Sequence, residues 1–186
     1  TCRTLPILDR LNSIPDHEAR VYTPEEMAGQ WREISAITGV AIDPGLWTDD
    51  PPQSTWPACL AVKAAERQGL TLCAQFLKIL RANIMQKRRN GSRREVLAEV
   101  AHEAGLDIDR FQHDLTYNRD DLEQEVADDK RHAEANCVDR TPALLIKNDT
   151  GDKTLIVGLR DYSLFRQAAQ TLLAEQRERE ERLARL

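Results

Sequence analysis

Apolar residues recur every three or four positions over most of the chain, which is the period of an amphipathic helix. The first such helix is expected to begin at Thr23, because Pro24 suits the first helical position and Glu26 completes a capping box. Gly39 predicts the end of this helix. The apolar residues expected on its buried side are Met27, Trp31 and Ile34, followed by Ile37 or Thr38.

The same period predicts further helices along the rest of the chain. They are expected to begin at Ala58, Leu70, Ser92, Asp107, Arg119 and Asp161. Ser92 and Glu95 repeat the spacing of a capping box. Asp107 and Asp161 are suitable N-cap residues for the helices that follow them.

Two short apolar runs near the C-terminal end have the length of strands. They cover residues 143–147 and 154–158, and a turn rich in Asn, Asp and Gly separates them, which predicts a hairpin. Pro142 stands directly before the first run, where a residue without a backbone N–H is tolerated. Another strand is expected at residues 5–8.

Two stretches are expected to be irregular. Residues 42–57 contain four prolines and two tryptophans, a composition that fits neither a helix nor a strand. Residues 87–94 form a basic turn, which we interpret as a solvated loop rather than a phosphate or nucleic-acid site.

Charge and cysteine usage narrow the classes of function. The 186 residues carry a net charge of −5, which argues against a nucleic-acid partner, and no apolar run approaches a membrane span. The four cysteines and four histidines show no metal-binding spacing, and no two cysteines form a C-x-x-C motif. Cys59 and Cys73 lie among apolar residues of helical patterns and are expected to be buried. This usage is typical of a reducing compartment, so we expect a cytoplasmic location.

Several segments resemble the DsbA-like family of the thioredoxin superfamily. The most specific likeness is the stretch DPGLWTDDPPQSTWPACLAVKAAERQG, residues 43–69. EVLAEVAHEAGLDIDRFQHDL and CVDRTPALLI resemble the same proteins in the same order. The resemblance implies an α/β, thioredoxin-like fold with a large helical insertion. Residues 1–22 and 137–186 would form the thioredoxin-like part, and residues 23–136 the inserted helical domain.

One part of the family pattern has no counterpart in this sequence. The family carries a C-x-x-C motif at a helix N-terminus, where the helix dipole lowers the pKa of a thiol. We therefore expect the N-terminal βα unit to be missing, either through truncation or because this relative lacks the motif. The sheet edge left unpaired would favour a homodimer or a borrowed strand.

The resemblance also implies a site around the proline. Thr141 and Pro142 would be joined by a cis peptide bond, and the backbone of Thr141 would pair with an extended substrate. Cys137 lies five positions upstream of Pro142. It would form a mixed disulfide by attacking a substrate disulfide, and the alternative is a cysteine at a helix end without chemistry.

A second group of candidate residues lies in the proline-rich stretch. These residues are Trp47, Asp50, Ser54 and Trp56. By the resemblance, they would bind substrate as part of a loop that covers the cleft beside Pro142. The alternative is that the tryptophans are packing residues and that the other two only turn the chain.

The leading functional hypothesis is a DsbA-like thiol-disulfide oxidoreductase or isomerase, which would act on a protein or peptide thiol or disulfide through a mixed disulfide. No nucleic acid, membrane or metal is expected to take part. One alternative is a non-redox adaptor that binds a protein partner through the proline cleft and the helical domain. The other is a glutathione-dependent isomerase similar to 2-hydroxychromene-2-carboxylate isomerase. Apart from glutathione in that case, no cofactor is expected.

Overall fold

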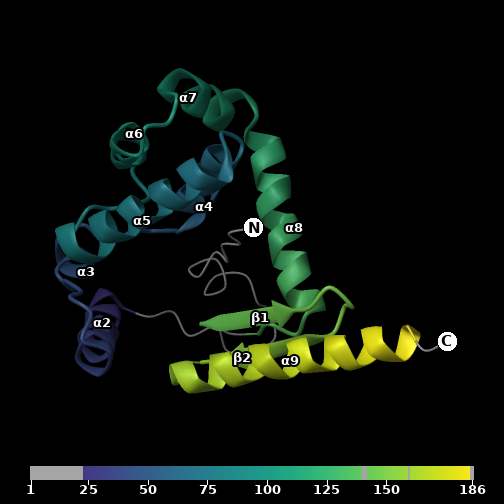
Figure 1. Ribbon diagram of the computed structural model, residues 1–186. Coiled ribbons are helices and arrows are strands. Elements are labelled where there is room, and N and C mark those ends of the chain that lie inside the picture. The colour runs from purple at the N-terminus through teal and green to yellow at the C-terminus, as the bar shows by residue number, and fades with distance from the viewer. Residues whose placement is uncertain (1–22, 140–141, 159, 185–186) are drawn as a thin grey trace. The chain divides into compact units, whose positions relative to one another are not determined.

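The computed structural model describes residues 23–139, 142–158 and 160–184, shown as a ribbon in Figure 1. These residues fall into two compact units, which divide between Asp129 and Lys130. The strand expected at residues 5–8 lies outside the described residues. The grouping of residues 1–22 with 137–186, and of 23–136 as an inserted domain, stays a prediction.

Helices make up most of the described residues. The helices of the first unit are α2 (Pro24–Thr38), α3 (Leu46–Asp49), α4 (Trp56–Glu66), α5 (Leu70–Lys87), α6 (Arg94–Glu103) and α7 (Ile108–Tyr117). α8 (Arg119–Ala135) begins in the first unit and ends in the second, which continues with β1 (Ala143–Lys147), β2 (Lys153–Val157) and α9 (Tyr162–Leu183). Across the described ranges, none of these helices has the length and apolar character that a bilayer crossing requires.

The predicted helices and hairpin are confirmed, with two differences in the proline-rich stretch. α3 is a short helix inside the region expected to be irregular, and α4 begins at Trp56 rather than Ala58. α4 carries Pro57 in its first turn, where the missing N–H of proline would have no partner, and the proline before α3, Pro44, precedes its N-cap residue Gly45. Proline content alone therefore underestimates the helix in this stretch.

Two predicted caps are confirmed. The N–H of Glu26 donates to Thr23 Oγ1 at 3.2 Å, and the N–H of Thr23 donates to Glu26 Oε2 at 3.0 Å. Asp107 Oδ1 accepts a hydrogen bond from the N–H of Arg110 at 3.0 Å and caps α7. Each cap satisfies an N–H group that has no partner within its helix.

Two other predicted caps are wrong in their side-chain bonding. The hydroxyl and N–H of Ser92 donate to Asn90 Oδ1 at 2.6 and 2.9 Å, and α6 begins after Arg93 instead. Because its hydroxyl is bonded to Asn90, the serine does not cap the helix. Asp161 stands at the N-cap position of α9, but its side chain makes no capping hydrogen bond.

The buried side predicted for α2 is also partly wrong. Ala28 is buried, whereas Ile34 and Ile37 are 42% and 67% exposed. α2 packs against α3, where the rings of Trp31 and Trp47 make a T-shaped contact with centroids 5.6 Å apart. A helix as short as α3 covers only part of α2, so the later turns of α2 stay open.

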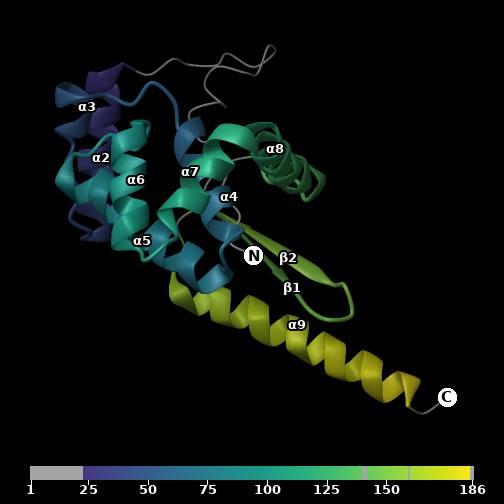
Figure 2. The ribbon, with the colours of Figure 1, turned by 90° about the horizontal axis from the view of Figure 1, so that it is seen from above.

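α4 is the centre of the first unit. Its residues from Cys59 to Ala65 are all buried. Three of these are alanines, and small side chains let helices approach closely, so α5, α6 and α7 all pack against α4. α6 also contacts α5, and Figure 2 shows it crossing over that helix. A helix that is covered on every side must neutralise any charge it carries inside the protein.

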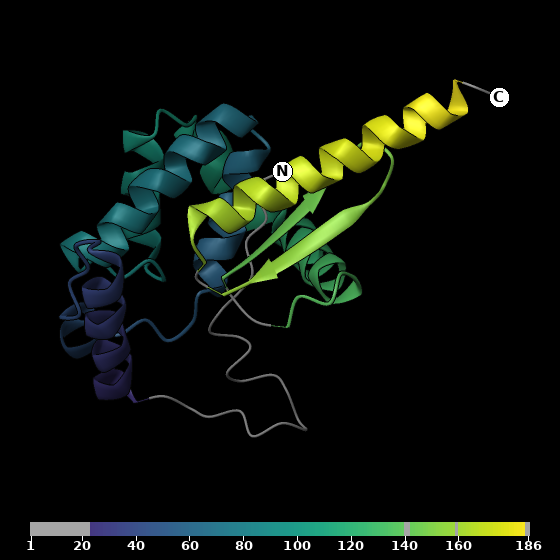
Figure 3. The ribbon, with the colours of Figure 1, turned by 60° about the horizontal axis from the view of Figure 1, so that its bottom comes forward.

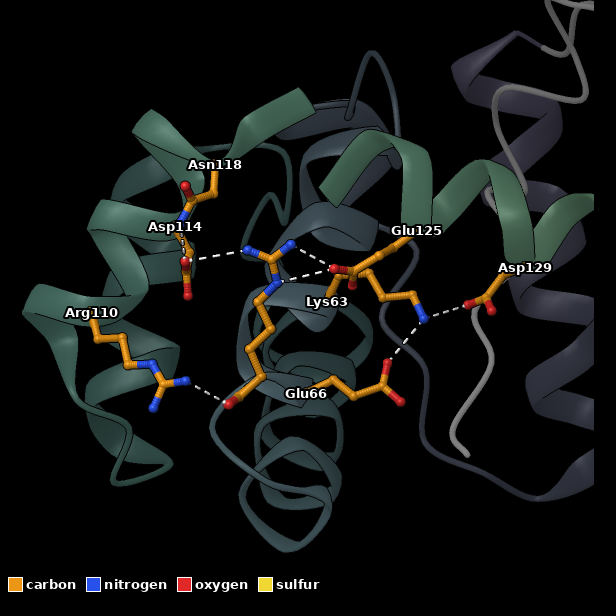
Figure 4. Close-up of polar contacts among 8 residues, drawn as sticks. Lys63, Glu66, Arg110, Asp114, Asn118, Glu125 and Asp129 are labelled. Carbon is orange, nitrogen blue, oxygen red and sulfur yellow. Dashed lines mark hydrogen bonds and ion pairs between the residues drawn. The ribbon is translucent and has the colours of Figure 1, made fainter. Parts of the chain in front are cut away.

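α4 carries such a charge at Lys63. Its ammonium lies 2.9 Å from Glu66 Oε2 and 2.7 Å from Asp129 Oδ2 of α8, and its side chain is only 6% exposed (Figure 4). Burial alone would lower the pKa of Lys63, but the hydrogen bonds and charges of Asp129 and Glu66 outweigh burial and raise it. The lysine therefore stays charged and ties α4 to α8.

A second ion-pair group joins the same helices to α7. Arg67, the residue after α4, donates to Glu125 Oε1 of α8 at 2.6 Å and to Asp114 Oδ1 of α7 at 3.4 Å. Asn118 donates to the same oxygen of Asp114 at 2.7 Å, and Figure 4 shows this amide above the carboxylate. Arg110 donates to the backbone carbonyl of Arg67 at 2.8 Å. The ion pairs of Lys63 and Arg67 together join α4 to α7 and α8.

The second unit is an antiparallel hairpin with α9 along one face, as Figure 3 shows. Ala143 pairs with Val157, and the register continues to Lys147 opposite Lys153. Ile156 of β2 and Leu172 of α9 are buried. α9 contacts both strands, so this helix covers the apolar face of the hairpin.

The hairpin turn is fastened to α9. Within the turn, Asn148 Oδ1 accepts a hydrogen bond from the N–H of Asp152 at 2.8 Å. Asn148 Nδ2 donates to the carbonyl of Leu172 at 3.1 Å, and Arg179 donates to the carbonyl of Thr150 at 3.2 Å. Asparagine and aspartate therefore shape this turn as the sequence predicted.

The variant Lys63→Met should lower the free energy of unfolding by about 3 kcal/mol, because Asp129 would lose its cation inside the protein. Urea denaturation measures the change. Lys78→Met, at an exposed position of α5, is the control and should change stability by less than ~0.5 kcal/mol. The double variant Lys63→Met/Asp129→Leu should recover most of the loss. A single variant as stable as the wild type would contradict the structural role of the pair.

Candidate functional site

The proline segment lies between α8 and β1. Cys137 follows the end of α8 with a backbone φ of 59°, in the left-handed region that favours glycine. Its N–H donates to the carbonyl of Glu134 at 2.9 Å, and the residue is exposed. Pro142 is exposed directly before β1, and its carbonyl accepts a hydrogen bond from the N–H of Gly158 at 2.8 Å. The hairpin therefore fixes the proline, and the thiol of Cys137 is accessible.

Part of the predicted proline site lies outside the residues that the structure describes. Thr141, and with it the expected cis peptide bond to Pro142, lies outside the described residues. The roles of Thr141, Pro142 and Cys137 toward a substrate stay predictions. The proposed loop over the proline belongs to the other compact unit, so its position above the proline also stays a prediction.

Trp47 lies in α3 and is buried, with 7% of its surface exposed. Its ring packs against Trp31 of α2 in an edge arrangement with an interplanar angle of 85°. The buried indole N–H has no acceptor among the described residues. Packing rather than hydrogen bonding therefore holds this tryptophan, and it anchors α2 to the proline-rich stretch.

Ser54 and Trp56 lie where the proline-rich stretch enters α4. Ser54 Oγ accepts a hydrogen bond from the N–H of Trp56 at 3.0 Å, which supports the start of the helix. Trp56 is partly buried and packs against the core around α4. Both residues shape the loop, and a substrate-binding role for them stays a prediction.

Asp50 is bound by the basic turn that precedes α6. Arg93 donates to both carboxylate oxygens of Asp50, at 2.6 and 2.7 Å, and Asn90 Nδ2 donates to Oδ1 at 3.1 Å. Two further acids of the proline-rich stretch are held in the same way, because Arg88 lies 2.8 Å from Asp43 Oδ2 and 2.9 Å from Asp49 Oδ2. We call these five charged residues, Asp43, Asp49, Asp50, Arg88 and Arg93, the loop clamp.

The loop clamp changes the acidity of its carboxyl groups. The hydrogen bonds from Arg93, and then from Asn90, hold the pKa of Asp50 below its ordinary value. Hydrogen bonds from Arg88 and from the N–H of Gly45 likewise lower the pKa of Asp43. A lowered pKa in the folded state stabilises the fold above the ordinary aspartate pKa, and this stabilisation is lost as the pH falls through the lowered value. The clamp should therefore loosen in acid.

The loop clamp adds a binding role to residues 87–94, which were interpreted as a solvated loop and whose Arg88 and Arg93 stay 49% and 58% exposed. Arg88 and Arg93 bind acids of the proline-rich stretch, and Arg89 pairs with Glu99 at 2.6 Å. The available signal was the match between a cluster of acids and a cluster of arginines. Helical periodicity could not use it, because Asp50 and Arg93 are 43 positions apart.

The described thiols are not equivalent. Cys59 and Cys73 are buried as predicted, with 5% and 1% exposure, and Cys73 Sγ contacts the carbonyl of Val62 at 3.6 Å. Cys137 is the exposed cysteine of the described residues. A single thiol is able to form a mixed disulfide, but its resolution needs a second thiol from elsewhere. Among these residues, no group of three or more His, Cys, Asp or Glu side chains is arranged to hold a metal ion.

The family comparison covers most of the chain. A family model described as Thioredoxin matches residues 7–167. Among solved structures, a putative protein disulfide isomerase from Nitrosomonas europaea superposes with a TM-score of 0.72 at 19% identity, covering 83% of this chain and 76% of that chain. The cytosolic disulfide reductase DsbM from Pseudomonas aeruginosa gives a TM-score of 0.58 at 22% identity, covering 98% and 81%. These likenesses confirm the predicted thioredoxin-like fold with its helical insertion, and at such identities they establish the fold alone.

The curated relatives carry a different description. A ClpXP adapter protein SpxH from Halalkalibacterium halodurans is 29% identical over 158 residues, which is 84% of this chain and 51% of that protein. The protein of the same name from Bacillus subtilis is 34% identical over 91 residues, 48% of this chain and 30% of that protein. The one from Shouchella clausii is 27% identical, covering 90% and 61%. The chain thus spans about half the length of the curated relatives it matches.

The variant Arg93→Gln should return the pKa of Asp50 toward the ordinary aspartate value, because Arg93 makes the largest contribution to its lowering. Carboxyl ¹³C NMR titration of the folded chain measures this pKa. Arg94→Gln, next in sequence, is the matched control, since Arg94 donates to Thr116 Oγ1 whereas Arg93 and Asn90 lower the pKa of Asp50, and it should leave the titration unchanged. An Asp50 pKa that is the same in the wild type and in Arg93→Gln would show that the loop clamp does not form in solution.

Proposed function

This chain belongs to the thioredoxin family, and on that premise we propose that it acts as an adaptor, binding a protein partner rather than turning over disulfides through a cysteine pair. The observation that carries this proposal is the common description of its curated relatives. The proteins from Halalkalibacterium halodurans, Bacillus subtilis, Bacillus licheniformis and Shouchella clausii are all named as ClpXP adapters. ClpXP is accordingly the partner that we propose for this chain.

The surface of the first unit supports this proposal. Ile34, Ile37 and Val40 are 42%, 67% and 50% exposed at the end of α2 and just beyond it. Ile34 and Ile37 are three positions apart, so they lie on one side of the helix. Grouped exposed apolar side chains on a soluble domain commonly mark a surface that binds another protein. We call these three residues the α2 patch, and we assign to it a contact with the partner.

The loop clamp gives this surface a fixed support. It holds the proline-rich stretch against the turn before α6, and Trp47 of that stretch packs against Trp31 of α2. A surface held in one conformation loses less entropy when it binds. On this proposal, the residues first interpreted as a substrate loop serve to hold the partner-binding helix.

A thiol activity is the second candidate, and the exposure of Cys137 favours it. The thiolate of the accessible Cys137 would attack one sulfur of a partner disulfide. A mixed disulfide with that partner cysteine would form, and the other partner sulfur would leave as a thiolate. The exchange would hold a partner covalently. It would not give turnover by this chain unless a further thiol resolved it.

The wild-type chain should bind purified ClpXP of Halalkalibacterium halodurans saturably in biolayer interferometry. Ile37→Asp should weaken this binding about tenfold, because a charge replaces an apolar contact at the interface. Leu173→Asp is the matched control, since Leu173 is 52% exposed on α9, outside the α2 patch. It should bind as the wild type does. No saturable binding by the wild type would contradict the adaptor proposal, and equal loss in both variants would contradict the α2 patch.

The reduction of insulin by dithiothreitol separates the two candidates. We expect the wild-type chain to give no acceleration over the uncatalysed reaction, and Cys137→Ser to leave ClpXP binding unchanged. The buried Cys59 and Cys73 should remain unmodified by iodoacetamide in the folded chain, while Cys137 is alkylated. Insulin reduction that disappears in Cys137→Ser would instead favour the oxidoreductase.

A further inference from the structure

The first unit contains a small cavity of about 220 Å³ at a junction of helices. Residues of the α4 start, the α6 start, the end of α7 and the first residue of α8 surround it. The lining residues are Pro57, Leu60, Ser92, Arg94, Leu97, Leu115 and Arg119. We call it the arginine pocket, and neither the loop clamp nor the α2 patch shares a residue with it.

The floor of the arginine pocket is part of the core. Leu60 and Leu97 are 1% and 3% exposed, and Leu115 packs against the same cluster. These side chains are held by α4, α6 and α7, which the core joins. The apolar floor is therefore already formed before any ligand enters, and this reduces the entropy that binding would cost.

The rim of the pocket is cationic. Arg94 donates to Thr116 Oγ1 at 3.1 Å, and it makes no ion pair with a carboxylate of the described residues. This sets it apart from its neighbours Arg88, Arg89 and Arg93, each of which pairs with an acid. Arg119 pairs through Nε with Glu123 at 2.8 Å. Because a guanidinium has five N–H donors, both arginines keep donors for another acceptor.

We infer that the arginine pocket binds the C-terminal residue of a peptide, with an apolar side chain on the leucine floor and its α-carboxylate on Arg94 and Arg119. The cavity is smaller than the roughly 300–1,000 Å³ of pockets that bind drug-sized ligands, so its size suits a single side chain. A planar carboxylate matches the fork of an arginine in two parallel hydrogen bonds. A free phosphate would use the rim but leave the apolar floor empty.

N-acetyl-L-leucine is the probe for this inference, and N-acetyl-L-leucinamide is its uncharged match. Methyl NMR spectra of the full chain should show saturable shifts at Leu60, Leu97 and Leu115 with the acid. The amide should bind about tenfold more weakly, because it lacks the charge that the arginines recognise. Inorganic phosphate should leave the leucine methyl signals unshifted. Phosphate binding as tight as that of the acid would overturn the assignment in favour of a general anion site.

Arg94→Gln should weaken binding of N-acetyl-L-leucine about tenfold while the methyl spectrum of the free chain stays that of a folded protein. Arg81→Gln, on the exposed surface of α5, is the control and should bind the acid as the wild type does. The inference is overturned if the acid causes no saturable shift at the three leucines, or if Arg81→Gln weakens binding as much as Arg94→Gln. The probe needs no ClpXP, so this result is read separately from the adaptor test.

Discussion

A charged lysine inside a buried helix is the constraint on which the helical unit depends. α4 is covered by α5, α6 and α7, so the side chain of Lys63 is only 6% exposed and its ammonium needs acids at hydrogen-bond distance. Asp129 supplies one of them from α8. The position of α8 along α4 is thereby specified by charge as well as by packing, and Arg67 repeats the arrangement with Glu125. The register of these helices follows from these pairs.

The same device, a carboxylate held by a basic side chain, organises the surface where we place the function. Asp50 and Arg93 fix the proline-rich stretch, and Trp47 carries that order on to α2. The isoleucines that remain exposed on α2 are therefore presented by a supported helix rather than by a free one. In an adaptor, such a surface can bind a partner without any chemistry at a thiol, and the exposed Cys137 is then a separate feature of the second unit.

Local chemistry in the sequence predicted the elements better than it predicted their surroundings. Thr23 with Glu26 and the Asn-Asp turn depend on residues a few positions apart, and both were predicted correctly. The burial of Ile34 was not, because a helical period shows which side is apolar but not whether anything packs there. The loop clamp and the ion pair of Lys63 join segments that are distant in the sequence, so no local pattern predicts them. The capping pattern around Ser92 failed because the serine hydroxyl donates to Asn90 instead.

Hydrogen–deuterium exchange of the chain with and without ClpXP tests the central claim most directly, because it reports which backbone segments the partner covers. Our account predicts slower exchange across residues 34–40 in the complex, with no change in the peptide that contains Cys137 and Pro142. Slower exchange confined to the Cys137–Pro142 peptide, with residues 34–40 unaffected, would contradict it and would place the function at the proline and the thiol.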